Sequence, residues 1–226
     1  MKIASLKPVN WVPDQPVAVK PHMRGWLHTV AAPLSLAASI VLLVLAPTTS
    51  TKWASAVYLA ASLILFGVSA IYHRFYWAPR WEHMWRRLDH CNIFLLIAGT
   101  YTPLAVALLG EPYQRNLLVT VWTGAVAGIL LNLFWPTAPR WLSTLVYVIL
   151  GWVAVWYLPQ LWTAGGPAIV WLIVAGGVLY TAGAVVYARR SPNPSPTWFG
   201  FHEIFHLCTV LAWACHCVAV FLAVLG

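Results

Sequence analysis

Long apolar runs separated by short polar breaks make up most of the chain after its first two dozen residues. Seven of these runs are long enough to cross a bilayer, which takes about 20 mostly apolar residues. The breaks are rich in proline, glycine, arginine and lysine, as expected of loops at a membrane surface. The pattern predicts transmembrane helices near residues 28–46, 53–73, 89–109, 116–135, 141–158, 167–188 and 201–225.

The composition supports the same class of protein. Of the 226 residues, 61% are hydrophobic and only 8% are charged, whereas about 25% of residues are charged in an average soluble domain. Such a chain cannot cover its apolar surface in water, so we expect an all-α, polytopic membrane protein, a bundle of seven transmembrane helices. The net charge of +8 is spread over short loops and does not indicate a nucleic-acid partner.

The loop charges predict an orientation. The N-terminal tail and the second, fourth and sixth loops carry eleven of the thirteen basic residues, and the opposite side carries only Lys52 and Arg115. By the positive-inside rule the N-terminus is cytoplasmic and the C-terminus lies outside. We therefore divide the chain into a cytoplasmic tail, 1–25, and a seven-transmembrane-helix domain, 26–226. The polar, proline-rich tail has no apolar core of the signal-peptide type. The eleven residues are Lys2, Lys7, Lys20, Arg24, Arg74, Arg80, Arg86, Arg87, Arg140, Arg189 and Arg190.

Small residues inside the predicted spans are interpreted as packing features. Gly124 and Gly128 form a G-x-x-x-G pattern, which favours close packing of helices within the bundle, with homo-oligomerisation as the second interpretation. The four cysteines lie in or near predicted spans without a C-x-x-C pattern. We interpret them as small apolar filler.

Polar residues that remain within the spans mark a candidate site, because ionisable groups are costly there. Ser69 and His73 end the second predicted helix, Asp89 begins the third, and His202 and His206 begin the seventh. Since the helices alternate in direction, all five lie near the cytoplasmic interface. Residues four apart are about 40° apart around a helix and about 6 Å apart along it, so His202 and His206 can bind one ion.

The five residues together predict a metal site. Three imidazoles with one open position are typical of catalytic zinc, and His73, His202 and His206 supply them. Asp89 is then placed to hydrogen-bond a water at the open position or to accept its proton. Each residue alone has a plainer interpretation: His73 as a helix-end polar group, Ser69 as bonded to its own helix, and Asp89 as paired with Arg86 or Arg87.

The other histidines fit this site less well. His28 opens the first span at the right depth and is either a reserve ligand or a polar wall. His216 is ten residues beyond His206, about 15 Å along the helix, and cannot reach the same ion. His22 and His83 are predicted to lie in loops.

The pentad HEIFH at 202–206 also matches the H-E-x-x-H pattern of zinc proteases, in which the glutamate is the base. A third protease ligand is missing downstream, because no acidic residue follows Glu203 and the extended motif is broken by Thr209 and Ala212. We therefore interpret Glu203 as a residue that supports the site or lies at the interface.

Three motifs in order resemble a known family: FGVSAIYHRF at 66–75, LDHCNIFLLIAGTYTP at 88–103, and HEIFH followed by His216. They resemble bacterial hemolysin III, of the progestin and adipoQ receptor superfamily that includes the adiponectin receptors. The resemblance covers 24–225 and implies a multi-pass protein of the bacterial plasma membrane.

The resemblance also implies roles for single residues. Three histidines, here His73, His202 and His206, bind zinc near the cytoplasmic side, with Ser69 and Asp89 around the water at the metal. Eukaryotic relatives are receptors with ceramidase-like activity, and bacterial members are named for cytolysis. The chain departs from the family before the first span, where PHMRGWLH replaces an acidic E-x-x-N motif.

Three functions follow as hypotheses. The first is a zinc-dependent hydrolase of a lipid amide or ester, with Asp89 as general base and Ser69 orienting the water or stabilising the oxyanion. The second is a non-enzymatic, receptor-type membrane sensor in which structural zinc joins two helices. The third is a cytolytic or pore-forming protein, which the outer halves of the spans, poor in polar residues, favour least.

Overall fold

The computed structural model describes residues 20–226 apart from residue 136, and among these residues its extended secondary-structure elements are all helices. Most of the predicted tail, with Lys2 and Lys7, lies outside the described residues. The elements are α1 (Trp26–Leu45), α2 (Thr49–Arg74), α3 (Pro79–Leu108), α4 (Tyr113–Phe134), α5 (Arg140–Gly151), the 3-10 helix η1 (Trp152–Tyr157), α6 (Leu158–Arg189) and α7 (Phe201–Leu225).

Six helical segments of the described chain are long and apolar enough to cross a membrane. Five of them are α1 to α4 and α7. The sixth is the 49-residue stretch Trp141–Arg189, which contains η1, α6 and nearly all of α5. The prediction of an all-helical, multi-pass membrane protein is confirmed, while the seven-span count and the side on which each terminus lies stay predictions.

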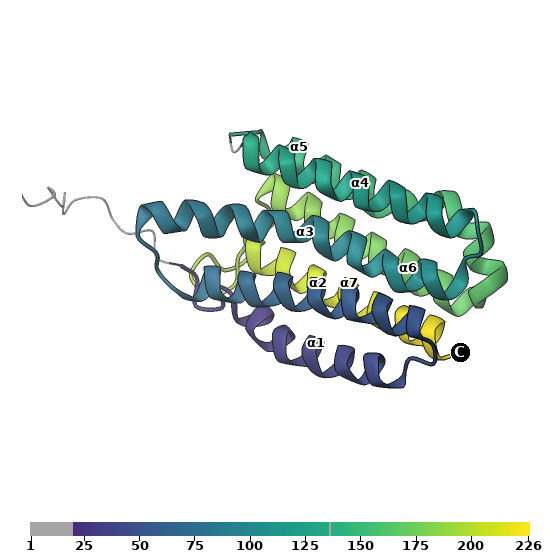
Figure 1. Ribbon diagram of the computed structural model, residues 1–226. Helices are drawn as coiled ribbons and strands as arrows, with labels where there is room; N and C mark the ends of the chain where they lie inside the picture. The colour runs from purple at the N-terminus through teal and green to yellow at the C-terminus, as the bar shows by residue number, and fades with distance from the viewer. Residues whose placement is uncertain (1–19, 136) are drawn as a thin grey trace, which may run out of the picture.

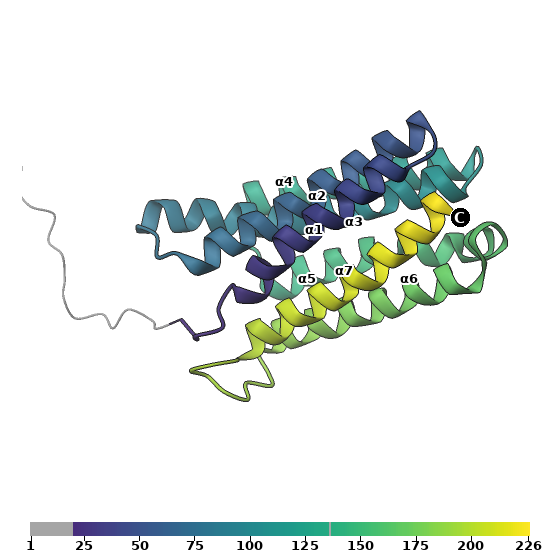
Figure 2. The ribbon, with the colours of Figure 1, turned by 90° about the horizontal axis from the view of Figure 1, so that it is seen from below.

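The helices run side by side along one direction (Figure 1). Helix α2 packs against both α1 and α3, α3 continues to α4, and α6 packs along α7. In the second view, α1 to α3 lie along one side and α6 and α7 along the other, with α7 also contacting α1 and α3 (Figure 2). The C-terminal end of α2 and the N-terminal ends of α3 and α7 therefore meet at one end of the bundle.

Helices α3 and α6 exceed the predicted spans by the most, by about nine or ten residues each. Helix α3 begins at Pro79, ten residues before the predicted boundary, because proline at the first helical position suits a helix start and the polar stretch after it continues the helix beyond the apolar span. His83 is consequently a helix residue, and its prediction as a loop residue is wrong. Helix α6 begins at Leu158 and bends at Gly166, whose φ is 74°, just before Pro167.

The core is formed by large side chains from several helices, including the fully buried Tyr58, Phe66 and Phe94. The G-x-x-x-G pattern belongs to this core. A Cβ on Gly128 would lie 2.2 Å from the Phe94 ring, and a Cβ on Gly124 would lie 2.6 Å from Leu150 Cδ1. Packing within the bundle, the first interpretation of these glycines, is confirmed.

Candidate metal centre

Three histidines from two helices converge at the end of the bundle where α2 stops and α7 starts. One ring nitrogen from each of His73, His202 and His206 lies within 4.8 Å of the other two. The Nε2 atoms of His73 and His202 are 3.3 Å apart, which agrees with the spacing of about 3.3 Å for two imidazole ligands of a tetrahedral zinc at about 2.05 Å. His73 and His206 are buried. The group can therefore hold a metal ion, as its spacing in the sequence predicts.

The start of α7 is held by two side chains that accept hydrogen bonds from its first backbone groups. The amide oxygen of Asn193 accepts from the Phe201 N–H at 3.1 Å, and Oε2 of Glu203 accepts from the Gly200 N–H at 2.8 Å. These groups have no partner within the helix. The two contacts fix where α7 begins, and thereby the position of His202 and His206.

Glu203 itself is buried, with 1% of its side chain exposed, and its other oxygen pairs with Arg24. The Arg24 Nε donates to Oε1 at 2.5 Å. Both carboxylate oxygens are thus engaged, and Glu203 is not among the residues that converge as metal ligands. The interpretation of Glu203 as a supporting residue agrees with this geometry, and the protease role does not.

Residues 20–25 run against the loop that precedes α7. The His22 and Met23 N–H groups donate to the carbonyls of Thr197 and Trp198 at 2.9 and 3.2 Å, and the His22 ring stacks on Trp198. Burial is the main cause that lowers the pKa of the Lys20 ammonium, and the nearby positive charge of Arg24 lowers this pKa further.

Gly25 lets this segment approach the metal centre closely. Its φ is 80°, and a Cβ there would lie only 2.9 Å from the Cβ of His73. Lys20 Nζ donates to the Phe75 carbonyl at 2.7 Å, just beyond the end of α2. Residues 20–25 therefore contact both halves of the centre, α2 through Gly25 and α7 through Arg24.

Asp89 and Ser69 lie beside the histidines. Asp89 Oδ2 is 3.5 Å from His73 Nε2 and 4.0 Å from His90 Nδ1. Its ion-pair partners among the described residues are thus histidines, and the alternative pairing with Arg86 or Arg87 is wrong. Ser69 is buried and lines the same cavity as Asp89.

His28 packs on the centre without joining the ligand group. Its ring is parallel to that of His206 at a centroid distance of 3.8 Å, and neither of its buried nitrogens has a hydrogen-bond partner among the described residues. Of its two predicted roles, the structure supports the polar wall. His216 lies away from the ligand group, and its Nε2 is 3.1 Å from the Ile173 carbonyl oxygen.

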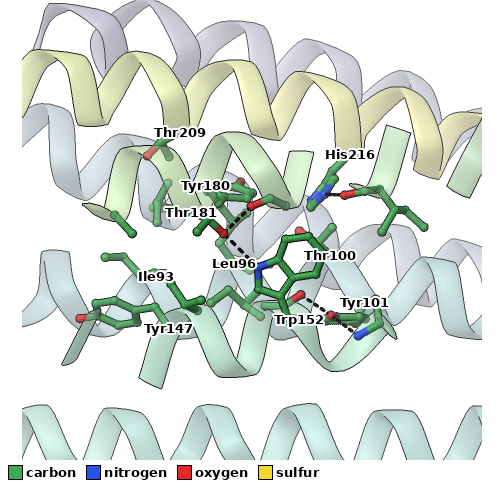
Figure 3. Close-up of a pocket in the computed structure, with 18 of the residues that line it drawn as sticks. Ile93, Leu96, Thr100, Tyr101, Tyr147, Trp152, Tyr180, Thr181, Thr209 and His216 are labelled. Carbon is green, nitrogen blue, oxygen red and sulfur yellow. Dashed lines mark hydrogen bonds between the residues drawn. The ribbon is translucent and has the colours of Figure 1, made fainter. Parts of the chain in front are cut away.

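An apolar cavity of about 120 Å³ extends from the metal centre into the bundle, from His206, Ser69 and Asp89 to His216 and Leu158. Figure 3 shows side chains of α3, α5, η1, α6 and α7 surrounding this space. The polar groups farther inside are largely paired: Tyr101 bonds the Gly151 carbonyl, and Trp152 donates to Thr181. The cavity therefore offers an apolar wall next to a polar end that includes one of the candidate metal ligands, His206.

A family model described as haemolysin-III related matches residues 17–217 of the chain, nearly its whole length. The chain belongs to this family. Hemolysin-3 of Bacillus cereus is 35% identical over 181 residues, which cover 77% of this chain and 81% of that protein. The Hemolysin-3 homolog of Bacillus subtilis (strain 168) is 29% identical over 178 residues, with 77% and 83% covered. The resemblance drawn from the three motifs is confirmed.

One functional contact of this haemolysin-III-related chain was missed by sequence reasoning. In the sequence Arg24 is one of the basic residues that set the predicted orientation, within the PHMRGWLH stretch that departs from the family pattern, yet it is the partner of Glu203. One feature of the sequence pointed to a basic partner for Glu203: an acid at the start of an apolar helix needs a cation nearby. Arg24, directly before the first apolar run, was one of several candidates. Nothing local in the sequence distinguished Arg24 from other basic residues on that side.

Proposed function

We propose that this chain is a zinc-dependent hydrolase of a lipid amide or ester, acting at the cytoplasmic leaflet of the bacterial plasma membrane. The observation that carries the proposal is a three-histidine group of which His206 lines an apolar cavity, together with Asp89 and Ser69. The proposal includes the predicted topology, a cytoplasmic tail (1–25) before seven spans. Helix α5 and η1 together are about 30 Å long, enough to cross the hydrocarbon core.

The donor set fits zinc. Three neutral imidazoles leave one position open, the pattern of catalytic rather than structural zinc. Zinc held by His73, His202 and His206 would act as a Lewis acid and lower the pKa of a coordinated water towards about 7. The chain's own residues supply the remaining functions.

Asp89 is the proton acceptor in this proposal. Its carboxylate lies 3.5 Å from a ligand nitrogen of His73, so it is within reach of a water that occupies the open position, and a positioned base is effective only at such distances. The Ser69 hydroxyl, on the same cavity wall, donates a hydrogen bond that orients the water or stabilises the oxyanion. The buried surroundings strengthen both interactions.

The cavity supports a lipid substrate. Ligand sites that take apolar molecules are concave and lined mostly by apolar side chains, with a few polar groups that orient the reacting part. Here the polar groups are at the metal end, and the cavity continues as apolar wall towards Leu104 and Leu158. An acyl chain in this space would place its amide or ester beside the histidines.

The test uses purified full-length protein in detergent with bound zinc and a panel of ceramides and phospholipids. Turnover of at least one lipid by the wild type, reduced at least a hundredfold in Asp89→Asn with unchanged zinc content, is the expected result. The Asp14→Asn variant serves as the control, because residue 14 lies in the tail. Full zinc occupancy without turnover of any lipid would refute the hydrolase.

A receptor-type sensor with structural zinc is the second candidate, because the three ligands join α2 to α7. In that case chelation lowers the melting temperature and no lipid is hydrolysed. A hydrolase instead loses turnover on chelation. A third function, cytolysis, has only the hemolysin name of the two relatives in its favour, and leakage of liposomes by the purified protein would test it.

A further inference from the structure

A second pocket, separate from the metal centre, lies at the same end of the bundle. It has a volume of about 100 Å³ and is enclosed by the first turns of α3, the end of α4, the start of α5 and the end of α6. A single water needs only about 10–15 Å³ by a comparable measure. The pocket therefore has room for a polyatomic ligand group.

The charge of this pocket is positive. Arg86, Arg87 and His83 of α3 line it, and neither arginine has a carboxylate within ion-pair distance among the described residues. Glu82, one helical turn before Arg86, makes no such pair. An arginine pair without a counter-ion attracts an anion, and planar guanidinium groups match phosphate oxygens through paired hydrogen bonds.

Hydroxyl groups of α5 line the same pocket, and most of them are already hydrogen-bonded within the protein. Ser143 donates to Asn132 at 3.3 Å, and Asn132 donates to the Tyr147 hydroxyl at 3.1 Å. Thr144 differs, because its Oγ1 is buried and has no hydrogen-bond partner among the described residues. A buried hydroxyl without a partner is costly, and Thr144 is one of the residues that line the pocket, so a ligand oxygen admitted to this wall would satisfy it.

We propose that this pocket binds a phosphate group, with Arg86 and Arg87 pairing with its charge and Thr144 donating a hydrogen bond. Basic pockets between transmembrane helices on the cytoplasmic side bind anionic lipid headgroups, and free phosphate offers the same chemistry. The site requires neither zinc nor hydrolysis, so it stands apart from the proposed function. The ring of Tyr187, which lines the pocket, lies 5.8 Å from the ring of His202 between centroids, so the pocket is next to the candidate metal ligands.

The test measures the melting temperature of the full chain in an uncharged detergent at fixed ionic strength. The probes are a short-chain phosphatidylglycerol and inorganic phosphate. The Arg86→Gln/Arg87→Gln variant is compared with Arg189→Gln/Arg190→Gln, which removes another adjacent, exposed arginine pair that does not line the pocket. We expect at least one probe to stabilise the wild type and the control, with an apparent Kd at least tenfold weaker in the Arg86/Arg87 variant.

The two probes distinguish the sources of the phosphate. A loss confined to phosphatidylglycerol assigns the site to a lipid headgroup, and a loss with inorganic phosphate as well assigns it to free phosphate. Equal stabilisation of the wild type and the Arg86/Arg87 variant by both probes, or no stabilisation of the wild type, overturns the proposal.

A second variant covers the case in which the arginine variant does not fold. Thr144→Val keeps the shape of the side chain and removes the unpaired hydroxyl. We expect it to weaken binding severalfold without lowering the melting temperature of the ligand-free protein. An unchanged affinity in Thr144→Val overturns the role of Thr144, and a lower ligand-free melting temperature would show a structural role instead.

Discussion

Glu203, the central acid of the HEIFH motif, is paired with Arg24 from the other end of the chain, with Oε1 and Nε 2.5 Å apart. Its second oxygen accepts the Gly200 N–H. The carboxylate therefore connects the segment before α1 to the first turn of α7. His202 lies in that first turn and His206 in the next one, so this ion pair positions two of the three candidate metal ligands.

Removing Arg24 should destabilise the fold, because it leaves the Glu203 carboxylate buried without a cation. Breaking a buried ion pair costs about 3–5 kcal/mol, and we expect Arg24→Gln to lie at the lower end since Arg24 keeps some solvent contact. Unfolding in mixed detergent micelles measures the change. Arg80→Gln, on the exposed start of α3, is the matched control and should stay within about 0.5 kcal/mol of the wild type.

The double variant Arg24→Gln/Glu203→Gln should recover part of the loss, because no buried charge then lacks a partner. If instead Glu203→Gln has wild-type stability and abolishes lipid turnover, the carboxylate acts in the chemistry and its assignment as a positioning residue is wrong.

Metal content should follow the histidines and not the aspartate. We expect His73→Ala and His206→Ala to lose bound zinc after purification, while Asp89→Asn keeps it, because Asp89 lies beside the ligand group and not within it. Elemental analysis by mass spectrometry gives the metal-to-protein ratio. His216→Ala is the control and should retain zinc. Loss of zinc in Asp89→Asn would make Asp89 a direct ligand.

Filling the cavity should block long substrates while leaving the metal in place. Gly177 lines the cavity, and the atoms nearest to a Cβ there belong to the Trp152 ring, at 3.4 Å and beyond, so Gly177→Leu adds its volume to the open space. We expect at least a tenfold loss of turnover on a long-chain amide, with unchanged zinc. Gly67→Leu, where a Cβ meets nothing within 4 Å, should retain turnover. Equal turnover in both variants would place the acyl chain elsewhere.

The glycine pattern of α4 should matter for stability and not for assembly. Gly128→Ala places a Cβ against the Phe94 ring, and overpacking of this kind costs about 1–3 kcal/mol. Gly67→Ala, in the open position on α2, should be neutral or stabilise the protein by up to about 1 kcal/mol. Light scattering of both purified variants should give the wild-type mass. A change of mass confined to Gly128→Ala would support the homo-oligomer interpretation.

The helices and the meeting of three histidines at one end of the bundle followed from local patterns. Membrane spans can be recognised in the sequence because nearly all of their residues face lipid or packed protein and are therefore apolar. Within lipid the backbone N–H and C=O groups must pair with each other, and the helix is the structure that pairs them within one segment. Spacing of four residues placed His202 and His206 on one face. The predicted start of α3 was wrong because the helix begins at Pro79, in a polar stretch that precedes the apolar run. Hydrophobicity alone does not mark such a stretch as helical.

By itself the sequence determined the protein class, the helices and which histidines meet at one depth, because all three depend on the period and length of hydrophobic segments. Tertiary structure decided the partners of the buried polar groups. Arg24 pairs with Glu203, His73 lies beside Asp89, and the rings of His28 and His206 stack. Such partners depend on which helices pack together and at what rotation. That choice results from side-chain fit across the whole bundle, and no short stretch of the chain contains it.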